Sequence, residues 1–222
     1  MTLNRVTLLG TDTGVGKTWI GCRLVAELRA RGATVGVFKP IESGCGPDEG
    51  PLVPADAFAL IEAAGGAQSA DSACPWPLPR PLTPASELQR LGRQITASQL
   101  VRAADAAQAG ADWLVVETAG GVLSPLTSSL ASADLASLLG GVAVLVAPNR
   151  LGAISQAVAA LEAARSREVV VAAVLLNNVG DVDAEVARSN EAWIRHACPE
   201  TRLFVVSDDV SQVVDVLLPS RR

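Results

Sequence analysis

The chain alternates between short apolar segments rich in β-branched residues and longer segments in which apolar residues recur at helical spacing. The short segments predict strands at residues 6–9, 34–38, 113–117, 142–147, 169–176 and 203–206. The longer segments predict helices at residues 18–31, 54–64, 96–109, 131–139, 153–164 and 184–196. This alternation is typical of an α/β fold with a doubly wound, mainly parallel sheet that carries helices on both faces.

One segment, residues 65–96, departs from this alternation. It contains the prolines Pro75, Pro77, Pro79, Pro81 and Pro84, each of which fixes φ and lacks a backbone donor. These residues exclude a central strand, so the segment is predicted to be an ordered or semi-rigid loop. A loop of this length in a compact domain is either functional or a rigid surface excursion, and the sequence leaves both interpretations open.

Length and composition indicate one packed domain over residues 1–222. Hydrophobic residues make up 49% of the 222 positions and charged residues 18%, which excludes a disordered chain. The net charge of −5 argues against nucleic acid or an anionic membrane as a partner. The longest apolar stretch, residues 169–176, is far shorter than the roughly 20 residues of a membrane span, and the N-terminal apolar segment is too short for an export signal.

Cysteine and histidine usage offers no sign of a zinc site or of nucleophilic catalysis. The four cysteines, Cys22, Cys45, Cys74 and Cys198, lie far apart and form no C-x-x-C pair, so reduced thiols and a cytoplasmic protein are expected. The single histidine, His196, falls in the last predicted helix and is interpreted as an ordinary helix residue.

The strongest chemical signal lies between the first predicted strand and the helix after it. The segment there reads Gly10-Thr11-Asp12-Thr13-Gly14-Val15-Gly16-Lys17-Thr18. Glycines let backbone N–H groups curl around phosphate oxygens, and the helix N-terminus adds partial positive charge. Lys17 is placed to reach the β- and γ-phosphates, and the Thr18 hydroxyl is a candidate Mg²⁺ ligand. The context of strand, loop and helix favours nucleotide binding over a bare tight turn, with residues 12–18 as the ATP contacts.

This loop is one residue longer than the standard phosphate-binding loop. Its first glycine, Gly10, lies six residues before Gly16. ATP-driven switch proteins that partition DNA carry a second lysine early in the loop, where this chain has Asp12. That difference argues against such a switch.

Three motifs in order resemble those of the dethiobiotin synthetase family. The loop matches G-T-D-T-x-V-G-K-T, residues 39–44 match K-P-x-x-S-G, and residues 116–121 match V-E-G-A-G-G with Thr118 in place of a glycine. The similarity extends from residue 8 to about residue 179. Two departures, Thr118 and the segment 82–86, bear on substrate recognition.

The resemblance implies an ATP-dependent ligase of biotin synthesis. Its reaction converts 7,8-diaminononanoate, CO₂ and MgATP to dethiobiotin, ADP and phosphate through a carbamate and its mixed anhydride with phosphate. Such a reaction depends on positioning and charge neutralisation. Lys17 and Lys39 are expected to supply charge, Thr13 and Ser43 to hydrogen-bond the carbamate, and Gly120 and Gly121 to face the substrate. Lys17 and Lys39 are also the two lysines among 18 basic residues.

Three oxygen-bearing side chains are candidate Mg²⁺ ligands: Thr18, Asp56 and Glu117. A carboxylate such as Glu117, at the end of an apolar strand beside the phosphate loop, lies where parallel α/β sheets bind ligands. Asp56 has a competing interpretation as a charge that stabilises the start of a helix after Pro54.

The resemblance also implies contacts to ATP and to the substrate from residues that follow two later predicted strands. Asn177 falls in the family's A-N-D-V position and is expected to pair with the adenine edge, in preference to the alternative that it only forms a turn at the strand end. Gly152, Ala153 and Ser155 begin a predicted helix, a natural carboxylate site. They are expected to hold the substrate carboxylate at the boundary of a homodimer.

Two other functions compete with the ligase. One is an ATP-driven switch whose output is partner binding, and the other is a domain of an amidotransferase-type cobyrinate synthetase. The chain lacks the cysteine-bearing glutaminase domain expected for the second.

Overall fold

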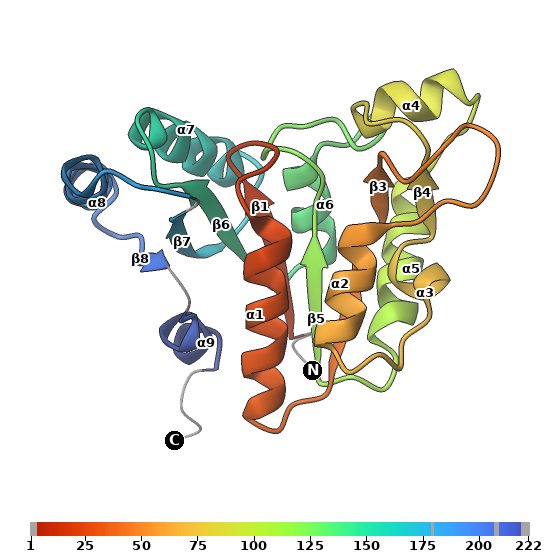
Figure 1. Ribbon diagram of the computed structural model, residues 1–222, viewed down its shortest axis with the longest axis horizontal. Coiled ribbons are helices and arrows are strands. Elements are labelled where there is room, and N and C mark those ends of the chain that lie inside the picture. The colour runs from red at the N-terminus through yellow and green to blue at the C-terminus, as the bar shows by residue number, and fades with distance from the viewer. Residues whose placement is uncertain (1–3, 179, 207–208, 219–222) are drawn as a thin grey trace.

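The computed structural model describes residues 4–178, 180–206 and 209–218. Within them, parallel strands form a six-stranded sheet in the order β2-β5-β1-β6-β7-β8 (Figure 1). The strands are β1 (Arg5–Gly10), β2 (Val35–Phe38), β5 (Trp113–Glu117), β6 (Val142–Pro148), β7 (Val171–Asn177) and β8 (Leu203–Val206). The predicted doubly wound α/β fold is confirmed. The ends of the predicted 1–222 domain lie outside the described residues.

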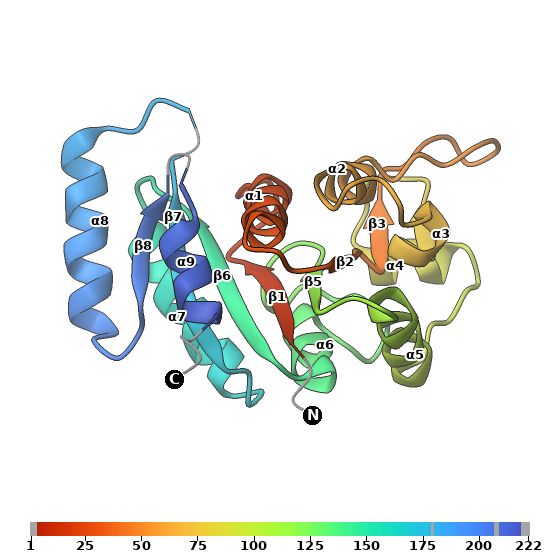
Figure 2. The same ribbon diagram turned by 90° about the horizontal axis from the view of Figure 1, so that it is seen from below.

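Helices cover both faces of the sheet (Figure 2). One face carries α1 (Lys17–Ala30), α2 (Ala55–Ala63) and α9 (Ser211–Leu217), and the other carries α5 (Ala97–Gln108), α6 (Ser132–Leu139) and α7 (Ala153–Arg165). The last long helix, α8 (Ala184–Ala197), packs against α7 and β8. None of the helices in the described part of the chain has the length and apolar character needed to cross a membrane.

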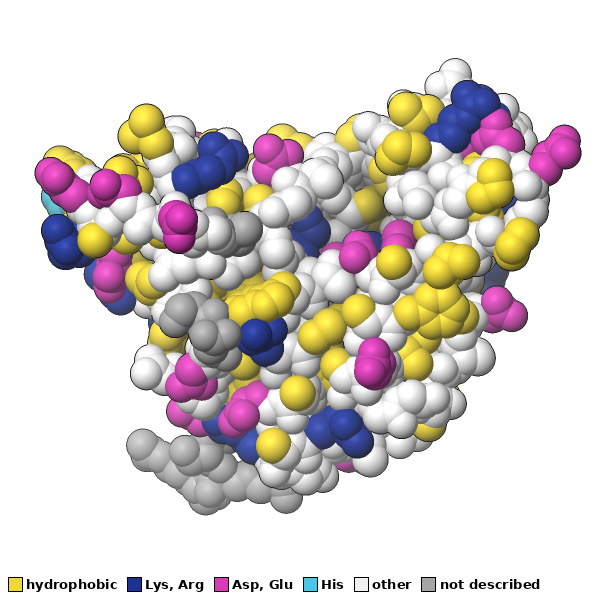
Figure 3. Space-filling view, viewed as in Figure 1, with side chains coloured by type: hydrophobic (Ala, Val, Ile, Leu, Met, Phe, Trp, Pro, Cys, Tyr) yellow, Lys and Arg dark blue, Asp and Glu magenta, His cyan; other side chains and the backbone are white. Residues whose placement is uncertain are grey.

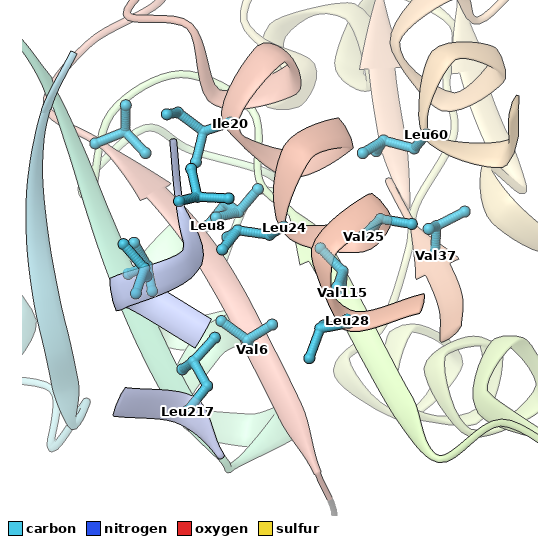
Figure 4. Close-up of a cluster of buried hydrophobic side chains, with 14 of the residues drawn as sticks. Val6, Leu8, Ile20, Leu24, Val25, Leu28, Val37, Leu60, Val115 and Leu217 are labelled. Atoms are coloured by element: carbon cyan, nitrogen blue, oxygen red, sulfur yellow. The ribbon is translucent and has the colours of Figure 1, made fainter. Parts of the chain in front are cut away.

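The core beneath the phosphate loop is built from strand and helix periodicity (Figure 4). Leu8 of β1 lies on one face of the sheet and packs in the cluster that holds Ile20 and Leu24 of α1, whereas Leu9 lies in the cluster on the opposite face. Residues four apart on a helix share a face and neighbours on a strand alternate. This packing fixes the first turn of α1 at the carboxyl edge of the sheet.

The prediction that residues 65–96 form a loop is wrong. The segment contains α3 (Ala70–Ala73), the short strand β4 (Trp76–Leu78) and α4 (Pro84–Arg90), and β4 pairs in parallel with β3 (Ile41–Ser43) in a separate two-stranded sheet. Proline is tolerated because the ladder bonds are made by its neighbours: Trp76 N–H donates to Pro40 (3.1 Å), and the Leu78 carbonyl accepts from Cys45 (2.9 Å). Pro84 is at the start of α4, where a missing N–H costs nothing.

The same segment supports β2, an edge strand of the main sheet. The side-chain amide of Gln68 accepts from Val37 N–H (2.9 Å) and donates to the Val37 carbonyl (2.8 Å), as a paired strand would. Lys39 N–H, just beyond β2, donates to the Ala73 carbonyl at 2.8 Å. The proline-rich segment therefore holds in place the strand end from which Lys39 projects.

Candidate active site

The predicted motifs meet in one cavity at the carboxyl edge of the sheet. The cavity measures about 610 Å³ and is lined by residues that follow β1, β2 and β5, together with the N-termini of α1 and α2. In the space-filling view, basic and acidic side chains lie together in a hollow between the tops of α1 and α2 (Figure 3). The sequence-predicted residues on its wall are Thr13, Gly14, Gly16, Lys17, Thr18, Lys39, Ser43, Asp56, Glu117 and Gly120.

The phosphate loop leads into α1 without a side-chain cap. Gly16 is the N-cap, with φ of 89°, and no side chain bonds to the first N–H groups of the helix. These donors and the positive end of the helix dipole therefore lie at the cavity. This is the arrangement that binds phosphate.

Lys17 bridges the two loops that follow β1 and β5. Its ammonium donates to the Asp12 carbonyl (3.0 Å) and to the Gly120 carbonyl (2.7 Å). Gly10 makes this possible, since a Cβ there would lie 2.6 Å from the ammonium and 2.9 Å from the Asp12 carbonyl oxygen. Burial, reinforced by the nearby Lys39 charge and opposed by Glu117, lowers the pKa of Lys17 to about 8.

Lys39 is buried between two carboxylates from different elements. Its Nζ lies 2.6 Å from Asp56 Oδ2 and 2.5 Å from Glu117 Oε1. Burial by itself would lower the pKa of Lys39, but the charges of Glu117 and Asp56 outweigh it and raise that pKa. In turn, Lys39 outweighs the effect of burial on Asp56 and holds the pKa of this carboxyl below its ordinary value.

The three predicted metal ligands lie together. The Thr18 hydroxyl donates to Glu117 Oε1 at 2.9 Å, and Lys39 joins Glu117 to Asp56. The second oxygen of Glu117 is buried and has no hydrogen-bond partner. The hydroxyl of Thr18 and the carboxylates of Asp56 and Glu117 are oxygen ligands of the kind that a hard cation such as Mg²⁺ prefers, and the unpartnered Glu117 oxygen is an acceptor that such a cation could use. The described residues contain no group of three or more His, Cys, Asp or Glu side chains that could hold a metal.

The loop after β5 is fixed by side chains that the sequence did not single out. The Ser124 hydroxyl accepts from Gly121 N–H at 2.7 Å, and the Ser132 hydroxyl donates to the Ala119 carbonyl at 2.8 Å. Gly120 has φ of +66°, and a Cβ there would lie 2.3 Å from the Ser124 oxygen. This glycine is therefore required by the conformation that brings its carbonyl to Lys17.

Thr118, the departure from the family motif, points away from the cavity. Its side chain is fully buried, and its hydroxyl donates to the Leu8 carbonyl at 3.0 Å, beside the bond from its own N–H to the same oxygen. The extra Cβ thus lies between β5 and β1, outside the substrate side of the loop.

Thr118→Val should destabilise the protein by about 1 kcal/mol, the worth of one hydrogen bond, without changing the shape of the loop. Urea unfolding measures the loss, and the turnover rate should stay within about twofold because no group of the cavity moves. A large loss of turnover at unchanged stability would place Thr118 in substrate recognition instead.

The opposite wall of the cavity comes from the segment predicted as a loop. Pro81, Leu82, Thr83 and Pro84 line it together with Ser43, whose hydroxyl oxygen is buried without a partner. The departure at residues 82–86 therefore lies at the cavity, unlike Thr118.

Several predicted contacts lie outside this cavity. The Asn177 amide is buried and donates to the Val15 carbonyl at 3.0 Å, so it supports the phosphate loop from β7. Gly152 and Ser155 line a different cavity, between α7 and α8, and Ala153 is buried. His196 packs edge-on against Trp193 on α8. The roles expected for Asn177 and for the start of α7 stay predictions.

Besides Ser124, sequence reasoning missed Trp19 and Glu42 on the wall of this cavity. Trp19 follows Thr18 in the first turn of α1 and stacks against the guanidinium of Arg23, 3.3 Å from the ring centre. Glu42 stands inside the K-P-x-x-S-G motif, between Lys39 and Ser43. A carboxylate inside a motif that also carries a lysine and a serine is the signal that could have drawn attention to it.

A parallel sheet whose first strand leads through a glycine-rich loop into an uncapped helix, with a buried lysine on the loop, defines a P-loop nucleotide-binding protein. The AAA domain family matches residues 4–210. The chain belongs to that family and, within it, to the ATP-dependent dethiobiotin synthetases.

The membership rests on relatives that match most of the chain. The ATP-dependent dethiobiotin synthetase BioD of Anaeromyxobacter sp. (strain Fw109-5) is 39% identical over 204 residues, which cover 90% of each protein. The protein of the same name from Anaeromyxobacter dehalogenans (strain 2CP-C) is 39% identical over 185 residues, 83% of this chain and 81% of the relative. The ATP-dependent dethiobiotin synthetase BioD of Phenylobacterium zucineum (strain HLK1) is 34% identical over 201 residues, which cover 88% of this chain and 85% of the relative.

Solved structures share the fold at much lower identity. MinC:MinD cell division protein complex from Aquifex aeolicus matches with a TM-score of 0.57 and 12% identity, over 96% of this chain and 84% of that one. Apo McdA from Cyanthece matches with a TM-score of 0.54 and 15% identity, over 97% of this chain and 90% of that one. These likenesses concern the fold alone.

Proposed function

We propose that the chain closes the ureido ring of dethiobiotin from 7,8-diaminononanoate, CO₂ and ATP. The observation that carries this proposal is the convergence of three motifs on one cavity: the phosphate loop with Lys17, the K-P-x-x-S-G segment with Lys39 and Ser43, and the loop after β5 with Glu117 and Gly120. Family membership supplies the substrates.

The reaction requires two bond-forming steps on the same carbon. One amine of the substrate adds to CO₂ and loses a proton, which gives a carbamate. A carbamate oxygen attacks the γ-phosphorus as ADP leaves. The second amine then attacks the carbonyl carbon, loses a proton and expels phosphate. Negative charge gathers on oxygens throughout, so fixed positive charge and hydrogen-bond donors are the principal requirement.

The cavity supplies such groups on both sides. Lys17 lies in the phosphate loop, where its ammonium can neutralise the β- and γ-phosphates, and Lys39 faces the transferring phosphoryl group and the carbamate. The hydroxyls of Thr13 and Ser43 are the proposed donors to the carbamate, with Gly120 and Gly121 as the backbone wall beside the substrate. The unpartnered Ser43 oxygen supports this role because a buried hydroxyl needs a partner.

Mg²⁺ is the proposed metal, with Thr18, Asp56 and Glu117 as the residues that would hold it. When bound with ATP, the ion neutralises charge on the β- and γ-phosphate oxygens. The spare Glu117 oxygen described above supports this donor set.

Glu117→Gln should reduce Mg²⁺-dependent turnover by about 10–100-fold, because the amide keeps the shape of the carboxylate but loses its charge. The measurement is the turnover rate over a Mg²⁺ titration. A variant with wild-type rate and wild-type Mg²⁺ requirement would assign Glu117 to structure alone.

Contacts to the ends of both substrates are also proposed. Asn177 contacts adenine at the end of β7, with Asp12, Gly14, Val15 and Gly16 around the phosphates. The substrate carboxylate is held by Gly152, Ala153 and Ser155 at the start of α7. Because these three lie apart from the main cavity, they contribute through a second subunit of a homodimer.

The direct test is phosphate release from MgATP and bicarbonate, with and without 7,8-diaminononanoate. ATP turnover should require the diamine, because the phosphoryl acceptor is the carbamate that it forms. Rapid hydrolysis that the diamine leaves unchanged would contradict the ligase and favour an ATP-driven switch.

A further inference from the structure

Glu42 is a buried carboxylate on the cavity wall whose two oxygens bind a neighbouring helix. Its side chain is 6% exposed. One oxygen accepts from Asp56 N–H at 2.9 Å and the other from Ala57 N–H at 3.0 Å. A side chain on β3 therefore holds the first turn of α2, fourteen residues further along the chain.

These two bonds replace the cap that α2 lacks. Its N-cap residue is Pro54, which makes no side-chain hydrogen bond to the helix. The first N–H groups of a helix have no partner within it, and a carboxylate is the acceptor that suits their partial positive charge. Glu42 supplies this acceptor from outside the helix.

One of the two N–H groups belongs to Asp56 itself. The same residue extends its side chain to Lys39 at 2.6 Å, and Lys39 also contacts Glu117. Fixing the backbone of Asp56 fixes the origin of its side chain, and a short aspartate side chain cannot compensate for a backbone shift of an ångström. The placement of the Asp56 carboxylate thus depends on Glu42.

We propose that Glu42 is a positioning residue, which sets the Asp56 carboxylate at the metal site by holding the first turn of α2. This inference rests on the proposed function, in which Asp56 is a metal ligand. Both carboxylate oxygens of Glu42 accept from backbone N–H groups of α2, so its proposed action on the metal is indirect, through Asp56. A glutamine in its place offers one acceptor oxygen, while its NH₂ group faces the second N–H, so one of the two bonds is lost.

The decisive measurement is metal affinity rather than activity. Mn²⁺ binding is followed by electron paramagnetic resonance of the free ion, in the presence of a non-hydrolysable ATP analogue, for the wild type, Glu42→Gln, Asp56→Asn and the double variant. Glu42→Gln should weaken Mn²⁺ binding by about tenfold, as is usual when a group that orients a ligand is lost. Analogue affinity without metal should change by less than about twofold.

The double variant separates positioning from direct contact. If Glu42 acts through Asp56, Glu42→Gln should add almost nothing on the Asp56→Asn background, because residues that act as one unit are not additive. Independent, additive losses would show that Glu42 acts on the metal by another route and would overturn the proposal.

Glu87→Gln is the matched control for a merely structural carboxylate. Glu87, a residue of α4, is fully buried and also accepts from a backbone N–H, that of Arg80 at 3.3 Å. Its ion-pair partner is Arg90 at 2.6 Å, and it contacts none of the proposed metal ligands. Its variant should lower the thermal midpoint and leave Mn²⁺ affinity unchanged. If Glu42→Gln behaves in the same way while Asp56→Asn weakens Mn²⁺ binding, the positioning role is wrong. If Asp56→Asn leaves Mn²⁺ affinity unchanged, the metal assignment within the proposed function fails instead.

Discussion

Replacement of Lys39 by methionine is expected to lower kcat by about 10²–10³-fold, the usual loss when one fixed group that stabilises transition-state charge is removed. Methionine keeps the length of the side chain and removes the charge that lies between Asp56 and Glu117. MgATP affinity should change by less than about tenfold, because the phosphate loop and Lys17 are untouched. Single-turnover phosphate release measures the first quantity and calorimetry the second.

Lys39→Arg serves as the charge-preserving comparison. A planar guanidinium is wider than an ammonium and orients by its fork, and Lys39 is only 5% exposed, held between two carboxylates. The arginine variant should therefore bind ATP and turn over slowly, like the methionine variant. Wild-type kcat in the methionine variant would mean that the charge of Lys39 serves the structure of the cavity rather than the reaction. Wild-type kcat in the arginine variant alone would mean that the charge suffices and that the compact shape of the ammonium is not required.

Lys17→Arg should weaken MgATP binding by about 10²-fold, which corresponds to the loss of one or two charge-assisted hydrogen bonds. The ammonium of Lys17 lies between two carbonyl oxygens at 3.0 and 2.7 Å, and a methyl-sized group at Gly10 would already lie 2.6 Å from it. A guanidinium does not fit this space without displacing the loop. Calorimetric titration with MgATP and with a non-hydrolysable analogue measures the effect.

The control for this variant is an exposed site with the reverse exchange, Arg93→Lys, which should change neither affinity nor stability. Thermal melting of Lys17→Arg without ligand should match the wild type within a few degrees. Unchanged MgATP affinity in a folded Lys17→Arg protein would contradict the phosphate role of Lys17.

The main sheet was predictable because its central strands are buried on both faces. Residues 113–116 are apolar without interruption and lead directly to Glu117, and the structure has β5 at the predicted residues 113–117. The phosphate loop was recognisable for a related reason: its glycines, lysine and threonine are contiguous in sequence, so local spacing alone reveals them.

Other features of the fold and the site depend on contacts between residues far apart in sequence, which the local spacing of residue types does not reveal. β4 includes Pro77, but the hydrogen bonds that pair it with β3 are made by the residues on either side of this proline. A rule that excludes strands wherever proline occurs therefore predicts a loop here. The cap that Glu42 places on α2 joins residues from two separate elements. The direction of the Thr118 side chain, toward Leu8 rather than the substrate, is likewise set by the neighbouring strand. Tertiary contacts decide such features, and one sequence does not display them.

The charges around the main cavity have a consequence for the form in which nucleotide arrives. Among the described residues on its wall, the ammonium groups of Lys17 and Lys39 face the carboxylates of Glu42, Asp56 and Glu117. The side chains of the wall thus carry three formal negative charges and two positive ones, and the positive end of the α1 dipole partly offsets this difference. Coulomb repulsion grows with the product of the charges that meet. Free ATP, with its full set of phosphate charges, is repelled more strongly than its complex with a divalent cation. We therefore expect the wall of the cavity to favour nucleotide that arrives as a complex with a divalent cation, before any atom of the adenine or ribose is recognised.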